Sequence, residues 1–217
     1  MRGMAGIRQF NEDAALERMM EVFWQRGYGA TSMQDLAQAT GILRGSLYNA
    51  YGDKQALFLL AYARYQARYL DTVRRTLDDA DPAAGLRAFF YYVIDSMSVP
   101  ARDGADDVAA TRGCLTTKTA TDEAAMAGPV RDALRGLLAE LEDVVCARFE
   151  RPDAHARLTL TPRAAARLVV TMTRGVAVMQ RIDDDAAQLK PVADSLAAVL
   201  FPAHQERPGK PERKKTR

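Results

Sequence analysis

A short polar stretch near the start of the chain carries the residues best suited to binding a charged, hydrogen-bonding surface. Between Gly41 and Gly52, an arginine, a serine, a tyrosine and an asparagine fall within six positions. On a helix they share the outward face with a glycine that lets the backbone approach closely: Arg44, Gly45, Ser46, Tyr48 and Asn49. Arginine can hold a guanine through two hydrogen bonds and asparagine can hold an adenine. This face is therefore suited to the major groove of DNA.

Three short helices are expected to position that face. Apolar spacing predicts helices over residues 12–26, 32–39 and, from 42 or 43, to about 50, with Gly41 in the turn. Thr31 with Gln34 predicts a capping box at the start of the second helix. The inward face is supplied by Phe23, Tyr28, Met33, Leu36, Ala37, Ile42 and Leu47. Two short helices joined by a three-residue turn predict a helix-turn-helix.

The rest of the chain also follows helical spacing, and strand alternation is almost absent. We predict an all-α fold of about nine helices. The later spans are 54–77, 82–98, 114–123, 129–150, 162–181 and 191–200, four of which begin at proline. Residues 100–113 are predicted to form a polar loop.

This pattern resembles the DNA-binding domain of the TetR family of transcriptional regulators. The resemblance is close over residues 16–62, and the helix layout extends it over nearly the whole chain. It rests on Gly27-Tyr28, Thr31-Ser32, Ala37 with Gly41, Gly45-Ser46-Leu47-Tyr48 and Lys54 with Leu57. The resemblance implies a ligand-responsive repressor that binds a palindromic operator in double-stranded DNA as a homodimer.

The resemblance also implies roles for individual residues. Thr31, Ser32, Tyr48 and Lys54 match phosphate-contacting positions, whereas Arg44, Gly45, Ser46 and Asn49 match the base-reading face. Tyr51 matches a packing position. Leu43 and Ala50 depart from the family pattern, because a serine or threonine usually caps the third helix and a larger side chain often stands at the second position. A leucine cannot accept a hydrogen bond from the helix N-terminus, which weakens the cap by about 1 kcal/mol.

Family members dimerise through their last two long helices, and the spacing of apolar residues in this chain agrees. Apolar and small residues recur at helical intervals in both segments, which suits a four-helix bundle made by two subunits. The predicted interface residues are Val169, Met172, Gly175, Val176, Met179, Val192, Leu196, Val199 and Leu200. The alternative is an ordinary core within one subunit.

The family resemblance places an unidentified small-molecule effector among the helices that follow the DNA-binding unit. An apolar cavity with a few polar groups is the usual form of such a site. Its predicted lining is Phe89, Tyr92, Met97, Cys114, Thr117, Met126, Leu138, Met172 and Gln180. For each of these residues, core packing is the competing interpretation.

Cys114 raises a different possibility. Arg112 and Lys118 flank it, and nearby cations lower the pKa of a thiol, so a thiol-based redox sensor is an alternative function. A helical protein-interaction module without specific DNA binding is another. We disfavour that module because Arg44, Tyr48 and Lys54 are polar, whereas a protein-binding face would more naturally expose apolar anchors.

Composition excludes several other classes. The chain has 217 residues and a net charge of +2, with a basic stretch over 207–217 that we expect to be disordered. No apolar run reaches membrane-spanning length and no signal peptide is recognisable, so we expect a cytoplasmic protein with no membrane partner. Two isolated cysteines and no catalytic or metal-binding motif predict no cofactor, no metal and no enzyme activity. The predicted domains are 1–53 for DNA binding, 54–203 for effector binding and dimerisation, and a tail over 204–217.

Overall fold

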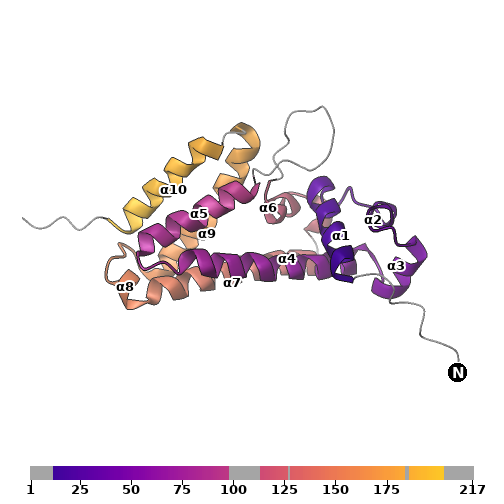
Figure 1. Ribbon diagram of the computed structural model, residues 1–217, viewed down its shortest axis with the longest axis horizontal. Coiled ribbons are helices and arrows are strands. Elements are labelled where there is room, and N and C mark those ends of the chain that lie inside the picture. Colours follow the sequence, from indigo (N-terminus) through magenta and orange to yellow (C-terminus); the bar gives the residue numbers. More distant parts are fainter. Residues whose placement is uncertain (1–11, 98–112, 127, 184–185, 203–217) are drawn as a thin grey trace, which may run out of the picture.

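The computed structural model describes residues 12–97, 113–126, 128–183 and 186–202. Ten α-helices and one 3-10 helix occur in these ranges, and no strand does, which confirms the all-α class and adds one α-helix to the expected number. The N-terminal helices form a head at one end of an elongated body (Figure 1). In chain order the helices are α1 (Glu12–Arg26), α2 (Met33–Thr40), α3 (Arg44–Tyr51), α4 (Lys54–Leu77), α5 (Pro82–Met97), α6 (Leu115–Ala120), η1 (Glu123–Ala125), α7 (Gly128–Glu150), α8 (Pro152–His155), α9 (Pro162–Asp183) and α10 (Ala186–Leu200).

The head is held together by the apolar faces of α1, α2 and α3. Leu36 and Leu47 are fully buried, and Phe23 packs edge-on against Phe58 from α4 with ring centroids 5.1 Å apart. Tyr28 also meets Phe58 at 5.1 Å. The inward residues expected from the sequence are buried, apart from the partly buried Ile42. These rings join the head to the start of α4.

The start of α2 differs from the expected capping box by one residue. Ser32 is the N-cap: its hydroxyl accepts from the Asp35 N–H, and the Asp35 carboxylate accepts from the Ser32 N–H. The expected pair, Thr31 with Gln34, is wrong because the Thr31 hydroxyl is buried and donates to the Gly27 carbonyl at 2.6 Å.

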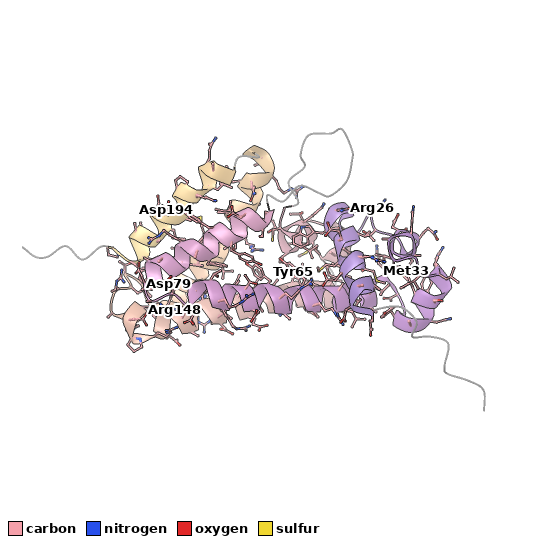
Figure 2. All side chains as sticks on the ribbon, in the orientation of Figure 1. Arg26, Met33, Tyr65, Asp79, Arg148 and Asp194 are labelled. Atoms are coloured by element: carbon pink, nitrogen blue, oxygen red, sulfur yellow. The ribbon has the colours of Figure 1, made fainter. Side chains whose placement is uncertain are left out.

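Helix α4 runs from the head along the body and is fixed at its C-terminal end (Figures 1 and 2). Arg148 of α7 is buried there, and its guanidinium donates to the carbonyls of Leu77 and Asp79 at 2.9 and 2.8 Å. Its Nη2 also bonds Asp153 at 2.8 Å. Backbone carbonyls at a helix C-terminus favour a cation, so this arginine anchors the end of α4.

Two segments near the C-terminus depart from expectation. Residues 152–155 form the short helix α8, which the predicted spans leave out. Helix α10 begins at Ala186 and contains Pro191, so the start expected at Pro191 is wrong. Proline lacks one helical N–H, but Lys190 pairs with Asp95 of α5 at 3.0 Å and Leu189 is buried. These tertiary contacts hold the turn before the proline.

The remaining helix boundaries agree closely with those predicted from the sequence. Helices α1 and α4 have the expected limits, whereas α6 is shorter than residues 114–123 because the chain changes to η1. Of the expected 82–98 helix, only the last residue lies outside the described ranges, as do most of the 100–113 loop and the whole 204–217 tail. None of the described helices combines the length and apolar character that spanning a bilayer requires.

Candidate DNA-binding face and interior cavity

Helix α3 presents a polar face to the surface of the head. Arg44, Gly45, Ser46, Tyr48 and Asn49 are exposed, while Leu47 between them is fully buried. Leu47 therefore fixes the rotation of the helix about its axis. The Arg44 guanidinium lies 3.4 Å from the Tyr48 hydroxyl and 5.5 Å from the centre of its ring, so the arginine extends along the helix surface.

The N-terminus of α3 lacks a side-chain cap, as the sequence predicts. Leu43 occupies the N-cap position, makes no capping hydrogen bond, and exposes 78% of its surface. The first backbone N–H groups of α3 consequently have no side-chain acceptor from their N-cap residue. Such groups attract anions, including a DNA phosphate.

Of the two predicted phosphate contacts at α2, the structure exposes one. Ser32 is exposed, but Thr31 is 2% exposed and both its hydroxyl and its N–H bond to backbone carbonyls of the head. The Thr31 prediction is therefore corrected: this residue closes the turn before α2. The Asp35 carboxyl has a lowered pKa because the Ser32 hydroxyl and N–H bond to it, and Arg26 pairs with it as well.

Lys54 also has a different role from the expected phosphate contact. Its ammonium donates to the carbonyls of Tyr28 and Gly29 at 2.9 and 3.4 Å and lies 4.6 Å from the centre of the Tyr28 ring. Asp53 caps α4 by accepting from the Ala56 N–H at 2.9 Å. Lys54 therefore links the turn after α1 to the start of α4, and contact with phosphate would require it to leave these carbonyls.

The predicted dimer residues separate into two groups. Val169, Val176, Leu196 and Leu200 are buried within the subunit, so the alternative interpretation, an internal core, is correct for them. The others are exposed or partly buried: Met172, Gly175, Met179, Val192 and Val199. The prediction missed three exposed apolar side chains of α9, namely Leu168, Val178 and Ile182. Helical spacing alone did not show which stripe of α9 faces outward.

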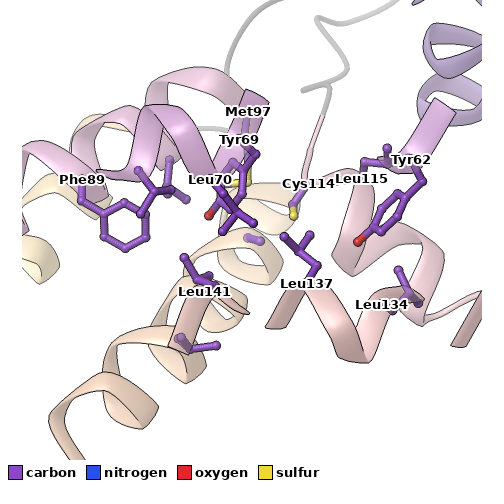
Figure 3. Close-up of a cluster of buried hydrophobic side chains, with 14 of the residues drawn as sticks. Tyr62, Tyr69, Leu70, Phe89, Met97, Cys114, Leu115, Leu134, Leu137 and Leu141 are labelled. Atoms are coloured by element: carbon purple, nitrogen blue, oxygen red, sulfur yellow. The ribbon is translucent and has the colours of Figure 1, made fainter. Parts of the chain in front are cut away.

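A small interior cavity of about 40 Å³ lies where the head meets the body. Three of its lining residues were predicted: Tyr92, Met97 and Cys114. The full lining is Trp24, Tyr65, Tyr69, Tyr92, Val93, Ser96, Met97, Cys114 and Arg174. Tyr69, Met97 and Cys114 lie close together in the close-up (Figure 3), and Tyr65 lies in the middle of the molecule (Figure 2).

The other predicted ligand residues lie outside this lining. Phe89 is fully buried in the core, and Met126 is 39% exposed, so neither contributes to the cavity. Leu138 and Met172 pack against the core from its edge. Buried Gln180 donates to the Ile94 carbonyl at 3.2 Å. Thr117 lies just behind the cavity, 3.4 Å from the Arg174 guanidinium.

Arg174 and the tyrosines of α4 were not among the ligand-site residues predicted from the sequence. A signal was present: Arg174 stands four residues after Val170 and three before Ala177, and both of these neighbours are buried. Helical spacing puts all three on one face. Tyr62, Tyr65 and Tyr69 are likewise three and four residues apart.

Cys114 lies beside a cation, but not beside the one expected. Lys118 instead donates to the carbonyls of Trp24 and Gln25, and Arg112 lies outside the described ranges. The Arg174 Nη1 atom is 3.3 Å from the Cys114 sulfur. Burial raises the pKa of the Cys114 thiol, but the Arg174 charge and hydrogen bonds from residues 116 and 117 outweigh it and lower the pKa overall.

We expect the two thiols to titrate in different pH ranges. In a Cys146→Ala background, the ultraviolet absorbance of the thiolate should appear below the ordinary cysteine pKa of about 8.5, and Arg174→Gln should move it upward. Because the folded-state pKa is lowered, the associated stability is present above the unfolded thiol pKa and is lost as the pH falls through the folded value. A titration of Cys114 at or above the ordinary value would contradict the Arg174 contact. Cys114→Ala provides the baseline.

Residues 113–122 are joined to the head by four hydrogen bonds. The Trp24 indole donates to the Gly113 carbonyl at 2.8 Å, and Lys118 of α6 donates to the last carbonyls of α1 at 2.9 and 2.5 Å. Asp122 accepts from the Gly29 N–H at 2.5 Å. Movement of α6 therefore acts directly on the end of α1 and on the turn that precedes α2.

The head and the helical body together define an all-helical protein of the helix-turn-helix class. The profile for bacterial regulatory proteins of the tetR family matches residues 15–61. Over 60 residues, 28% of this chain, the sequence is 45% identical to the HTH-type transcriptional repressor ComR of Escherichia coli (strain K12). That match spans only 29% of the length of ComR.

Two further comparisons extend over the whole fold. The HTH-type transcriptional repressor DhaR of Mycobacterium sp. (strain GP1) is 23% identical over 196 residues, covering 87% of this chain and 89% of the relative. The solved structure of the TetR-family regulator CifR, a cysteine mutant complexed with 26-base-pair operator DNA, has a TM-score of 0.73 and 28% identity. It covers 88% of this chain and 97% of that one. These matches confirm the resemblance seen in the sequence: the head matches the tetR-family profile, and the fold as a whole is similar to that of a TetR-family regulator.

Proposed function

We propose that this protein is a DNA-binding transcriptional regulator, a repressor that binds a palindromic operator and is released by a small-molecule effector. The observation that carries the proposal is α3, whose Arg44, Tyr48 and Asn49 are exposed around a buried Leu47. Arginine and asparagine read guanine and adenine in the major groove, and a recognition helix must present them on one fixed face. The CifR structure, solved with operator DNA, supports the same use of this fold.

The regulator acts as a homodimer in this proposal. Leu168, Gly175, Met179 and Ile182 form an outward stripe on α9, at intervals of seven, four and three residues, and Val192 and Val199 are exposed on α10. Apolar side chains exposed on adjacent long helices are typical of a subunit interface. A two-fold dimer would place two α3 helices in successive major grooves, about one turn of DNA apart.

The effector acts through the cavity between head and body. Its walls come from both parts, because Trp24 belongs to α1 while Tyr65 and Tyr69 belong to α4. Arg148 fixes the far end of α4, and Lys118 and Asp122 connect α6 to the head. A ligand that widens the cavity would therefore change the position of the head. It must bind the DNA-incompetent form more tightly, because equal affinity for both forms shifts nothing.

In the domain organisation that we propose, the head ends at residue 53 and the body begins with α4. Lys54 and Phe58 support a mechanical connection between α4 and the head: the first bonds to carbonyls of the head, and the second packs among its aromatic rings.

A mobility-shift assay of the full-length protein tests the proposal. The probes are the DNA fragments that flank its own gene and a scrambled fragment of equal length. We expect one fragment to be bound specifically, with an affinity that falls as salt is raised, because phosphate contacts release counterions. Equal binding to the scrambled fragment at every salt concentration would contradict operator recognition.

The contact between Cys114 and Arg174 favours one second candidate function. A thiol held 3.3 Å from a guanidinium could serve as the trigger of a redox-responsive regulator. Release of the operator on oxidation, abolished by Cys114→Ser, would distinguish this candidate from a reversibly bound effector.

A further inference from the structure

We propose that the interior cavity binds the carboxylate of a small aromatic acid, with Arg174 and Tyr69 as the groups that recognise it. The inference rests on the proposed function, since it names the chemical class of the effector. The groups that carry it come from three helices: Arg174 from α9, Tyr65 and Tyr69 from α4, and Tyr92 from α5.

The charge of Arg174 favours an anionic ligand. Its guanidinium contacts the hydroxyls of Thr173 and Thr117 and the Cys114 sulfur, but no carboxylate within the described part of the chain. The pKa of the guanidinium is raised: burial lowers it, but the neighbouring thiol and phenol groups outweigh that effect. Arg174 is partly buried, and a cation that is partly removed from water is stabilised by a nearby anion. A carboxylate is the anion that fits the planar, two-pronged donor of arginine.

The Tyr69 hydroxyl also favours a ligand that accepts a hydrogen bond. Tyr69 is 8% exposed and lines the cavity, and its hydroxyl makes no hydrogen bond of ordinary geometry among the described residues. Burial raises its pKa, and the nearby Arg174 guanidinium offsets part of that rise. Buried hydroxyls are normally hydrogen-bonded, so one without a partner in a cavity wall points to a group that is bound there. A phenol donates one hydrogen bond, which a carboxylate oxygen accepts.

The aromatic walls of the cavity favour an aromatic ligand. Trp24 meets Tyr65 edge-on at 5.3 Å, Tyr65 stacks on Tyr69 at 5.8 Å, and Tyr69 lies 6.2 Å from Tyr92. These rings form a continuous surface from α1 to α5. Flat aromatic bodies pack well between such rings, in stacked or edge-on contact.

The small volume of the cavity connects effector binding to movement of the head. A volume of about 40 Å³ exceeds the space for one water molecule but holds only a small polar group. The ring of an aromatic acid would therefore have to displace the walls. Met97 is the adaptable wall residue, because its side chain is unbranched and flexible. Opening this wall separates α5 from α4, the helix that carries the head.

Cys114 should make the affinity depend on pH. The groups that face its thiol are Arg174 from α9 and Tyr62, Tyr65 and Tyr69 from α4, together with the backbone of residues 116 and 117 in α6. A carboxylate beside Arg174 would disfavour the thiolate, so binding should take up a proton at high pH. The affinity should therefore fall as the pH rises through the thiol pKa, and Cys114→Ser should lose this dependence.

The test uses Trp24, the single tryptophan of the chain, as a fluorescent reporter in the cavity wall. The full-length protein is titrated with benzoate and with its uncharged analogue benzamide. We expect benzoate to change the fluorescence saturably and to bind more tightly than benzamide. Arg174→Gln should weaken benzoate binding by about tenfold or more, since it removes a charged hydrogen-bond donor. Arg167→Gln, at an exposed position of the same helix, should leave it unchanged.

Tyr69→Phe is the second variant, because it deletes only the hydroxyl and keeps the ring. It should weaken benzoate several-fold and leave benzamide less affected. Equal affinity for benzoate and benzamide, or benzoate binding that survives Arg174→Gln, would overturn the proposal. The proposal would also be overturned if the wild-type protein did not bind benzoate but dissociated from its operator on oxidation, and if Cys114→Ser abolished that dissociation. The titration contains no DNA, so its failure is separate from a failure of operator binding.

Discussion

An Arg44→Ala variant should bind the operator about 2 to 6 kcal/mol more weakly than the wild-type dimer. One bidentate arginine–guanine contact contributes about 1 to 3 kcal/mol of discrimination, and a dimer makes the contact twice. Arg44 is exposed on α3, where its side chain contacts Tyr48 of the same helix, so its removal should leave the fold intact. The measurement is a titration of operator and of a variant operator that carries a single base change. The variant protein should discriminate less between the two.

Arg75→Ala is the matched control for this experiment. Arg75 lies in the last turn of α4, with its side chain 69% exposed and paired to Asp71 at 3.2 Å. The 24 residues of α4 span roughly 36 Å at 1.5 Å per residue, so this charge is far from the head. An equal loss of affinity in both variants would indicate a general effect of net charge and would contradict base reading by Arg44.

A Gly175→Arg variant should be monomeric and should lose most of its operator affinity. Gly175 lies in the outward stripe of α9, and a Cβ atom there would meet nothing within 4 Å in the subunit. The arginine therefore fits the monomer and improves helix propensity by roughly 0.5–1 kcal/mol. Across a two-fold axis it would place two bulky charges together. Two linked heads bind about 10²- to 10⁴-fold more tightly than one, and this gain should disappear.

Sedimentation of the protein and operator titration measure the two effects together. Gly136→Arg is the control, because Gly136 is also exposed in a long helix, α7, with nothing within 4 Å of its Cβ position. It should remain dimeric and bind the operator normally. A Gly175→Arg protein that stays dimeric would place the interface elsewhere.

Local sequence information was sufficient to predict most features of the head. The limits of α1 and α4, the inward residues of the three-helix unit and the missing cap at Leu43 were all predictable, because they depend on helical spacing and on residues a few positions apart. The capping box was wrong by one residue. Thr31 and Ser32 are both able to cap a helix, and only the burial of Thr31 against Gly27 decides between them.

The cavity was only partly predictable. Tyr92, Met97 and Cys114 were included, whereas Arg174 and Tyr69 were missed, because an arginine and a tyrosine ordinarily remain at the surface. Their burial depends on α4, α5, α6 and α9 meeting at one point, and the contacts between these helices join residues far apart in the chain. Sequence spacing assigns a side chain to a face of its helix, but it does not say which helix will cover that face.

What the sequence determined by itself was therefore the helical class, the helix-turn-helix and the polar face of α3, all set by short-range spacing. The tertiary structure alone decided that Val169 turns inward and Met179 outward, that Lys54 bonds to the head, and that α10 continues through Pro191. Each of these outcomes depends on contacts between distant segments. Burial of apolar surface and pairing of polar groups act over the whole fold, and they override local preference where the two conflict.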